Sequence, residues 1–128
     1  MNEIRRKVLS LRIYMKPLLP SLREKNRYVV YKVVSHQPLD FHLVKDAVLK
    51  ACYQFMGQLH AAKAGLMVLD EWKYNQGIIK VNHKYLDELQ ASLLFIESIQ
   101  GKPLFVESVG VSGALNKAKL KFMKKGGT

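Results

Sequence analysis

The spacing of the apolar residues constrains the fold of this chain most. It changes along the sequence between a pattern typical of strands and a pattern typical of helices. Residues 28–35 (YVVYKVVS) are rich in β-branched and aromatic side chains with little alternation, as in a central strand covered on both faces. From Phe41 to Phe55 the apolar residues recur at intervals of three and four, behind Asp40 as N-cap. These patterns predict a strand followed by an amphipathic helix.

The same two patterns recur along the rest of the chain. Gly57 is expected to end the first helix. The later elements are predicted to be strands over 63–72 and 77–81, a helix capped by Asn82 and stopped by Gly101, a strand over 102–111, and a helix over 114–125. The order β-α-β-β-α-β predicts an α+β, ferredoxin-like fold: a four-stranded antiparallel sheet with two helices on one face, as in RNA-recognition domains, plus a basic C-terminal helix.

The 128 residues fit one domain, which we place at 27–125, between a distinct N-terminal region and a tail at 126–128. Residues 1–16 could form an amphipathic helix as an N-terminal extension. Pro17 and Pro20 then favour an extended arm over 17–26.

The positive charge of the chain is concentrated at its two ends. The net charge is +11, yet residues 28–112 contain eight lysines balanced by eight carboxylates. Residues 1–27 hold eight bases against two acids, and residues 113–128 add five lysines and no acid. An excess of positive charge that served only solubility could lie anywhere along the chain. Its concentration in two segments around a neutral centre therefore favours a surface that binds a polyanion.

No catalytic or metal-binding motif is found along the chain. The four histidines lack HxxxH or HExxH spacing, and Cys52 is the only cysteine, so a usual zinc site cannot be assembled. The stretch GVSG at 110–113 resembles a nucleophile elbow, but Ala114 stands where GxSxG requires glycine. Asp70 and Glu71 are adjacent in a predicted strand and should point to opposite faces. We expect no catalytic residue, metal or cofactor in this chain.

The sequence also bears on the cellular setting. No apolar run approaches the roughly 18 residues that cross a bilayer, and the first residues are too charged for a secretory signal. A single cysteine among apolar neighbours suits a reducing compartment. We therefore expect a cytoplasmic protein that does not span a membrane.

RNA is the polyanion that this fold and charge pattern favour, and it is expected to be held by its phosphates. Tyr28 and Tyr31 differ in strand parity and residues 77–81 contain no aromatic, so the base-stacking platform of RNA-recognition domains is missing. Ser112 and Gly113, at the start of the last helix, would offer a hydroxyl and free N–H groups to a phosphate. The open sheet face must still be covered, either by that helix through Leu115, Ala118 and Phe122 or by another protein.

Four segments in this order then suggest a family. They are LPSLREKNRY at 19–28, AKA at 62–64, GII at 77–79, and GVSG at 110–113 leading to Lys117, Lys119, Lys121 and Phe122. Together, over about residues 17–123, they resemble the Pop-type ribonuclease P subunits, the family of archaeal ribonuclease P protein component 2. Residues 1–14 lie before the usual family start, which is similar to Met15-Lys16-Pro17.

The resemblance implies a non-catalytic protein subunit of ribonuclease P, an endoribonuclease that removes the 5′ leader from precursor tRNA. The RNA subunit would perform the magnesium-dependent hydrolysis. The resemblance also implies a TIM-barrel-like protein partner, in a heterotetramer with two copies of each chain, and only indirect contact with precursor tRNA. The candidate RNA-binding residues are Arg23, Lys25, Arg27, Lys63, Ser112, Gly113, Lys117, Lys119 and Lys121.

Two alternatives stay open from the sequence alone. One is a ferredoxin-like interaction or ligand-binding module whose charge serves solubility. The other is attachment to a membrane surface through the basic amphipathic segment at 1–16. The sequence gives neither the oligomeric state, nor the RNA elements touched, nor the face that meets a protein partner.

Overall fold

The computed structural model describes residues 25–123. The predicted N-terminal helix, most of the predicted arm, Arg23 and the last lysines of the predicted C-terminal helix lie outside these residues. None of the helices in the described part is long and apolar enough to cross a membrane.

The described chain alternates strands and helices in the predicted order, with one additional small hairpin. The elements are β1 (Asn26–Val34), α2 (Phe41–Ala64), β2 (Met67–Lys73), β3 (Gln76–Asn82), the 3₁₀ helix η2 (His83–Tyr85), α3 (Leu86–Leu94), β4 (Ser98–Ile99), β5 (Lys102–Pro103), β6 (Phe105–Ser112) and α4 (Leu115–Phe122).

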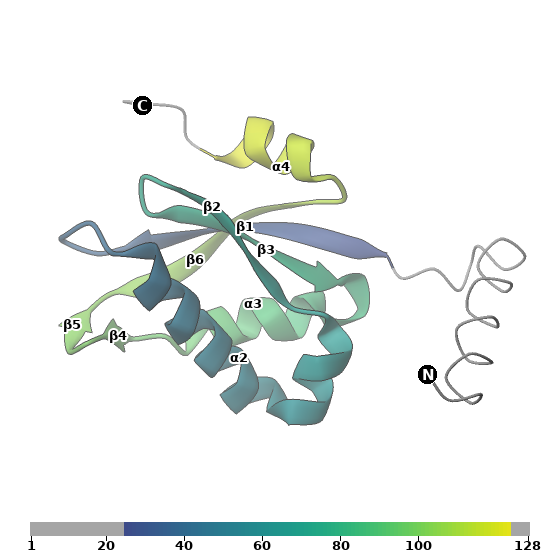
Figure 1. Ribbon diagram of the computed structural model, residues 1–128, viewed down its shortest axis with the longest axis horizontal. Coiled ribbons are helices and arrows are strands. Elements are labelled where there is room, and N and C mark those ends of the chain that lie inside the picture. The colour runs from purple at the N-terminus through teal and green to yellow at the C-terminus, as the bar shows by residue number, and fades with distance from the viewer. Residues whose placement is uncertain (1–24, 124–128) are drawn as a thin grey trace, which may run out of the picture.

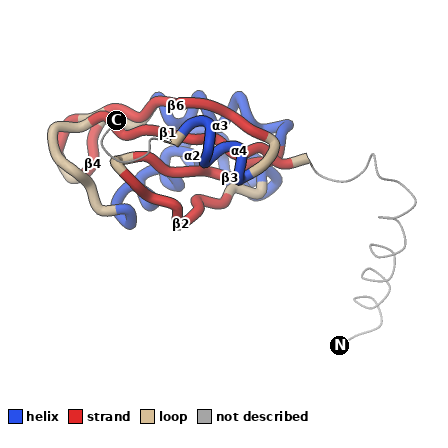
Figure 2. Tube along the Cα trace, turned by 90° about the horizontal axis from the view of Figure 1, so that it is seen from above, coloured by secondary structure: helices blue, strands red, loops and turns tan. Residues whose placement is uncertain are grey.

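The main sheet has the strand order β2-β3-β1-β6, and every neighbouring pair is antiparallel. Helices α2 and α3 lie on one face of it and α4 lies on the other (Figure 1). Seen from above, α4 crosses over the strands (Figure 2). This arrangement confirms the predicted ferredoxin-like α+β fold with an added C-terminal helix.

Strand β1 contributes to a hydrophobic cluster on each side of the sheet. Val29, Tyr31 and Val33 are buried in the large cluster with α2 and α3. Val30 is buried in a smaller cluster beneath α4, and Tyr28 packs at its edge. Successive strand side chains point to opposite faces, so the covering of both faces explains why the sequence of β1 shows so little alternation.

The prediction that Gly57 ends the first helix is correct for the first helical segment, but it missed a second segment that follows the glycine. Gly57 has φ 79° and ψ 162°, which interrupts the helix, but helical residues resume and continue to Ala64. Gly65 ends this second segment, in the left-handed conformation that a C-terminal glycine favours. Ala61 and Ala64 are buried in the core, so packing holds the added turns in place, and β2 starts only at Met67.

The prediction that the second helix continues to Gly101 is wrong. Helix α3 ends at Leu94, and the hairpin β4–β5 follows, with Gln100 and Gly101 at positive φ in its turn. Ile96 and Ile99 are buried although neither is helical, so the spacing of the apolar residues concealed this hairpin. Lys102 consequently belongs to β5 and not to the last strand of the sheet.

Two caps predicted from the sequence are confirmed, with Asp40 at the start of α2 and Asn82 at the start of η2, which leads into α3. The Asp40 side chain accepts a hydrogen bond from His42 N, and the Asn82 side chain accepts one from Lys84 N. Ser112, by contrast, does not cap α4. Its hydroxyl accepts from Ala114 N, one residue before the helix, and Ala114 itself is the N-cap. Helix α4 therefore begins at Leu115, one residue later than predicted, because Ala114 is still extended where the chain turns from β6 into α4.

Candidate nucleic-acid interface

One end of the sheet brings together basic segments from far apart in the sequence. Asn26 at the start of β1 pairs with Asn82 at the end of β3. Tyr28 pairs with Ser112 at the end of β6. The first strand, the last strand and the segment entering α4 therefore meet at this end, which we call the basic end. Of the predicted residues, Lys25, Arg27, Ser112 and Gly113 lie there.

Arg27 is held against the backbone at the basic end. Its guanidinium Nη1 donates to the carbonyl of Asn26, with an N···O distance of 3.0 Å. The same nitrogen lies 3.9 Å from the position that a Cβ on Gly113 would occupy. Because one hydrogen bond uses only part of the guanidinium fork, the remaining donors are available to a phosphate beside Gly113.

The start of α4 offers backbone donors next to this guanidinium. Ala114 is the N-cap and has no side-chain oxygen to satisfy the first N–H groups of the helix. Its own N–H is taken by the Ser112 hydroxyl, at an N···O distance of 3.2 Å. Ser112 is therefore engaged within the chain, whereas the first-turn N–H groups of α4 face the helix end, where an anion is favoured.

Two lysines that sequence analysis missed lie at the basic end. Lys80 is the cross-strand partner of Tyr28. The N–H of His83 donates to the carbonyl of Lys25 at 2.8 Å, so Lys84 in η2 follows directly on this contact. Both lysines had been counted in the neutral central region. The strand register places Lys80 beside the terminal bases, and the hydrogen bond of His83 places Lys84 there. The spacing of residues along the sequence reveals neither contact.

The three lysines of α4 do not form one group. Lys119 Nζ lies 2.8 Å from Glu71 Oε1 of β2 and forms an ion pair with it. Lys117 and Lys121 are four residues apart and share the other flank of the helix. Both are exposed, and Lys121 Nζ lies 5.6 Å from the centre of the Phe122 ring. The structure thus separates two exposed lysines from a third that is paired with a carboxylate.

A small apolar cluster fixes α4 on the sheet. Ala118 is fully buried against Val30 and Ile78, and Leu115 packs at the edge of this contact. Phe122 lies over Gly110 of β6 so closely that a Cβ on this glycine would overlap the ring. Of the two expected covers of the open sheet face, the structure shows the last helix, and the flank with Lys117 and Lys121 is held in a defined position.

Lys63 lies apart from the other candidates. It is exposed in the last turn of α2, not at the entry to a strand as expected. Helix α2 covers the face of the sheet opposite to α4 (Figure 1). Lys63 is therefore not part of the surface formed by α4.

Neither tyrosine of β1 is free to stack on a base. Tyr31 is fully buried on the α2 side, where its ring lies 6.2 Å from that of Trp72. Tyr28 is half-buried at the edge of the cluster beneath α4. The expectation that at most one of them faces the α4 side is confirmed, and that one is a packing residue.

Several other ionisable groups lie outside the basic end. Among residues 25–123, no three His, Cys, Asp or Glu side chains are grouped so as to hold a metal ion. Burial raises the pKa of the Cys52 thiol to about 11, so the nucleophilic thiolate is scarce at neutral pH. His60 Nδ1 lies 3.3 Å from Glu88 Oε2 in an exposed pair on the helix layer.

Comparison with known proteins agrees with this picture. Residues 27–123 match the sequence profile of the Rpp14/Pop5 family. Ribonuclease P protein component 2 of Thermococcus kodakarensis is 34% identical over 88% of this chain and 94% of its own length. The protein of the same name from Methanocaldococcus jannaschii is 32% identical over 85% of this chain and 81% of its own.

A solved structure supports the fold. A chain in the cryo-EM structure of yeast ribonuclease MRP superposes with a TM-score of 0.61 at 17% identity, over 81% of this chain and 82% of that one. At this identity the likeness concerns the fold alone. The profile match, by contrast, covers most of the chain, and the relatives align over nearly their whole lengths. The chain belongs to the Rpp14/Pop5 family.

Proposed function

We propose that this chain is a protein subunit of ribonuclease P that binds the catalytic RNA through phosphate contacts. The observation that carries the proposal is the convergence of Lys25, Arg27 and the N-terminal turn of α4 at one end of the sheet, beside Lys117 and Lys121. The names of the archaeal relatives support the assignment to ribonuclease P.

The donors of this surface suit a sugar–phosphate backbone better than base edges. Arg27 offers a forked guanidinium, α4 offers N–H groups, and lysine ammonium groups act as point charges. None of these groups discriminates among bases when it contacts a phosphate. The chain would therefore recognise the shape of a folded RNA and place its phosphates along α4.

The chemistry of the reaction would belong to the RNA. In this proposal the RNA, with magnesium ions, hydrolyses the bond that releases the 5′ leader of precursor tRNA, and this chain supplies no catalytic group and no metal ligand. A TIM-barrel-like protein subunit would join it in a heterotetramer with two copies of each chain. Precursor tRNA would be contacted only indirectly, and the complex would work in the cytoplasm.

The decisive experiment measures the affinity of the full chain for ribonuclease P RNA across a range of salt concentrations. If phosphates carry the binding, the logarithm of the association constant falls linearly with the logarithm of salt, by about 0.7–0.9 for each phosphate contact. Reversing Arg27 with Arg27→Glu should weaken binding to all RNA sequences similarly. Affinity that is insensitive to salt would contradict the proposal.

A second measurement tests the place of the chain in the enzyme. The chain, a ribonuclease P RNA and the TIM-barrel-like subunit are combined at low magnesium, and cleavage of precursor tRNA is followed. Neutralising phosphates lowers the magnesium concentration that a folded RNA needs, so the proteins should raise the cleavage rate most at low magnesium. Equal rates with and without this chain would argue against the role.

A further inference from the structure

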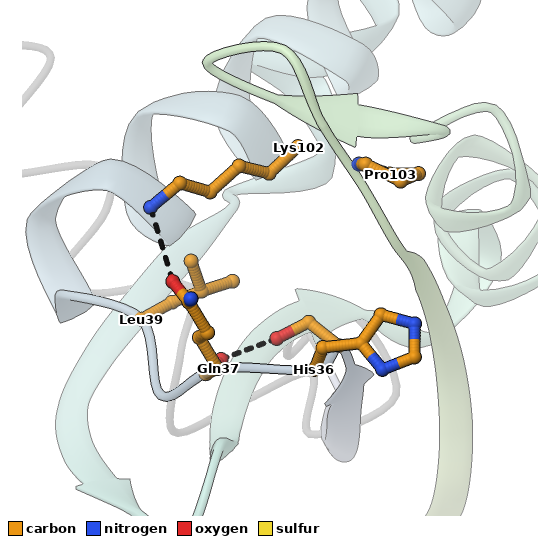
Figure 3. Close-up of a pocket in the computed structure, with 6 residues that line it drawn as sticks. His36, Gln37, Leu39, Lys102 and Pro103 are labelled. Carbon is orange, nitrogen blue, oxygen red and sulfur yellow. Dashed lines mark hydrogen bonds between the residues drawn. The ribbon is translucent and has the colours of Figure 1, made fainter.

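A pocket lies at the end of the sheet opposite to the basic end. It opens between the loop that follows β1 and the β4–β5 hairpin (Figure 3). Its lining residues are Ser35, His36, Gln37, Leu39, Lys102 and Pro103. Because β1 runs from the basic end to this loop, the two sites are separated by the length of a nine-residue strand, roughly 27 Å. The pocket is therefore distinct from the basic end.

Hydrogen bonds on both sides hold the pocket in shape. Lys102 Nζ donates to Gln37 Oε1 at 3.3 Å, which ties the hairpin to the loop across the opening (Figure 3). The Ser35 hydroxyl donates to the carbonyl of Gln37, and Leu39 N donates to the side chain of Asn75 at 3.3 Å. A ligand would consequently meet walls that are already formed, and binding would cost little ordering of the chain.

The volume of the pocket limits what it can hold. It measures about 180 Å³. A closed cavity of about 150 Å³ accommodates a benzene ring, so this open pocket has room for one flat ring system, and the rest of a larger ligand would extend into solvent. Its walls are mostly apolar, with Leu39 on one side, Pro103 on the other, and His36 on the same side as Pro103 (Figure 3). Flat faces with a polar edge at the rim match the shape of a nucleobase.

The polar groups around the pocket favour a nucleotide. Lys102 uses one of its three N–H donors on Gln37, which leaves two for a phosphate or a base oxygen. No carboxylate is among the six lining residues. An aromatic ring lies close to the pocket, because Phe105 is two residues after Pro103 and is 54% exposed. In the sheet, Phe105 pairs with Val34, which precedes the pocket residue Ser35. A base adjacent in the RNA strand could stack on this ring.

We propose that this pocket binds a single unpaired base of an RNA strand, with Lys102 contacting the phosphate or an oxygen of that nucleotide. The inference rests on the proposed RNA-binding function, but it adds a site that reads an unpaired base, whereas the basic end contacts only backbone. A partner protein inserting an aromatic side chain is the competing occupant.

Nuclear magnetic resonance can test the pocket directly. The isotopically labelled full chain is titrated with each of the four nucleoside 5′-monophosphates, and with ribose 5-phosphate as a control that lacks a base. We expect shifts of the backbone amides of the non-proline residues around the pocket, Ser35, His36, Gln37, Leu39 and Lys102, with nucleotides, saturating at millimolar concentration, and none there with ribose 5-phosphate. Equal shifts with both probes, or shifts confined to the basic end, would overturn the proposal.

Variants at the pocket rim make the test specific. His36→Ala and Lys102→Gln change exposed side chains, and each should weaken nucleotide binding about threefold or more. Lys50→Gln removes an exposed lysine of α2 and should leave the affinity unchanged. Thermal denaturation of all three variants checks that they remain folded. Unchanged affinity in both folded rim variants would refute the site.

Cross-linking separates this inference from the proposed function. Ribonuclease P RNA containing 4-thiouridine is irradiated in complex with the full chain and its TIM-barrel-like partner. A cross-link from an unpaired nucleotide to the peptides carrying His36 or Pro103 is the expected result. RNA binding in which every cross-link falls on peptides outside the pocket would refute the base site and leave the proposed function standing. If the full chain does not bind the RNA at all, both the base site and the proposed function are refuted.

Discussion

Single buried side chains set the chemical character of the core. Cys52 is fully buried, and its position among apolar residues in α2 was expected from the sequence. Burial raises the pKa of its thiol from the ordinary value of 9.0 to about 11, and a hydrogen bond with Ser92 opposes part of that rise. The neutral thiol is thus the form that suits the folded chain.

This pKa difference predicts a loss of stability in alkali. Because the folded pKa lies above the unfolded one, the stabilising contribution is complete below pH 9 and disappears as pH rises toward 11. At about pH 10.5 the free energy of unfolding should have lost about 2 kcal/mol from this group. Denaturant titrations at several pH values, with reductant present, measure the free energy of unfolding of the parent chain and of Cys52→Ala. An identical pH dependence in both chains would show that Cys52 does not contribute.

Gly77 shows a residue-scale constraint that the sequence did not reveal. A Cβ at this position would overlap the Tyr31 ring on the neighbouring strand. The GII segment was recognised as part of a family pattern, but spacing alone cannot say that β3 must approach a tyrosine here. The physical cause is the pairing of Tyr31 with Gly77, which requires the strand register.

At the scale of single elements, the kink in α2 is the largest departure from expectation. Gly57 combines φ 79° with ψ 162°, a conformation that residues with a side chain rarely adopt. A Cβ there would meet no atom within 4 Å, so the constraint lies in the backbone and not in packing.

Gly57→Ala should therefore destabilise the chain, even though alanine favours helices. The expected cost is about 1–3 kcal/mol in the free energy of unfolding, from backbone strain alone. Gln58→Ala, at the next and exposed position, should change stability by less than about 0.5 kcal/mol. Chemical denaturation of both variants makes the comparison. A more stable Gly57→Ala chain would mean that α2 straightens without penalty.

The division of the lysines on α4 predicts unequal effects on RNA binding. Lys117→Gln combined with Lys121→Gln should lower the slope of affinity against salt by about 1.5, which corresponds to two phosphate contacts. Lys119→Gln should change it far less, because Glu71 already neutralises that ammonium group.

Glu71→Gln provides the complementary test in the same binding assay. It frees Lys119 from its ion pair and should strengthen RNA binding. Equal losses for all three lysine substitutions, with no gain from Glu71→Gln, would mean that the ion pair does not persist when RNA is bound.

At the scale of the whole molecule, the sequence predicted the order of elements, the sheet and the covering helix. Those features depend on local periodicity and on apolar stripes, which the sequence displays. It did not predict the β4–β5 hairpin or the continuation of α2, because buried residues such as Ile96 and Ala61 have the same spacing in either arrangement. Arg27 and Gly113 were expected to bind phosphate, but their proximity depends on tertiary structure.

The separation of the core into two unequal clusters has a consequence for dynamics. Within residues 25–123, many residues bury α2 and α3 against the sheet, whereas the cluster beneath α4 has three buried members, Val30, Ile78 and Ala118, with a rim of partly buried side chains. Detaching α4 exposes little apolar surface, so it should open by local unfolding at a much smaller free energy than the whole domain.

Amide hydrogen exchange makes this difference measurable. Protection should be highest in β1, which pairs with β3 and β6 under cover on both faces, and clearly lower in α4. If RNA binds only the closed arrangement, its addition should slow exchange in α4 more than in β1. The helix that contacts RNA would then be ordered in part by the RNA itself, and equal protection in both elements without RNA would contradict this account.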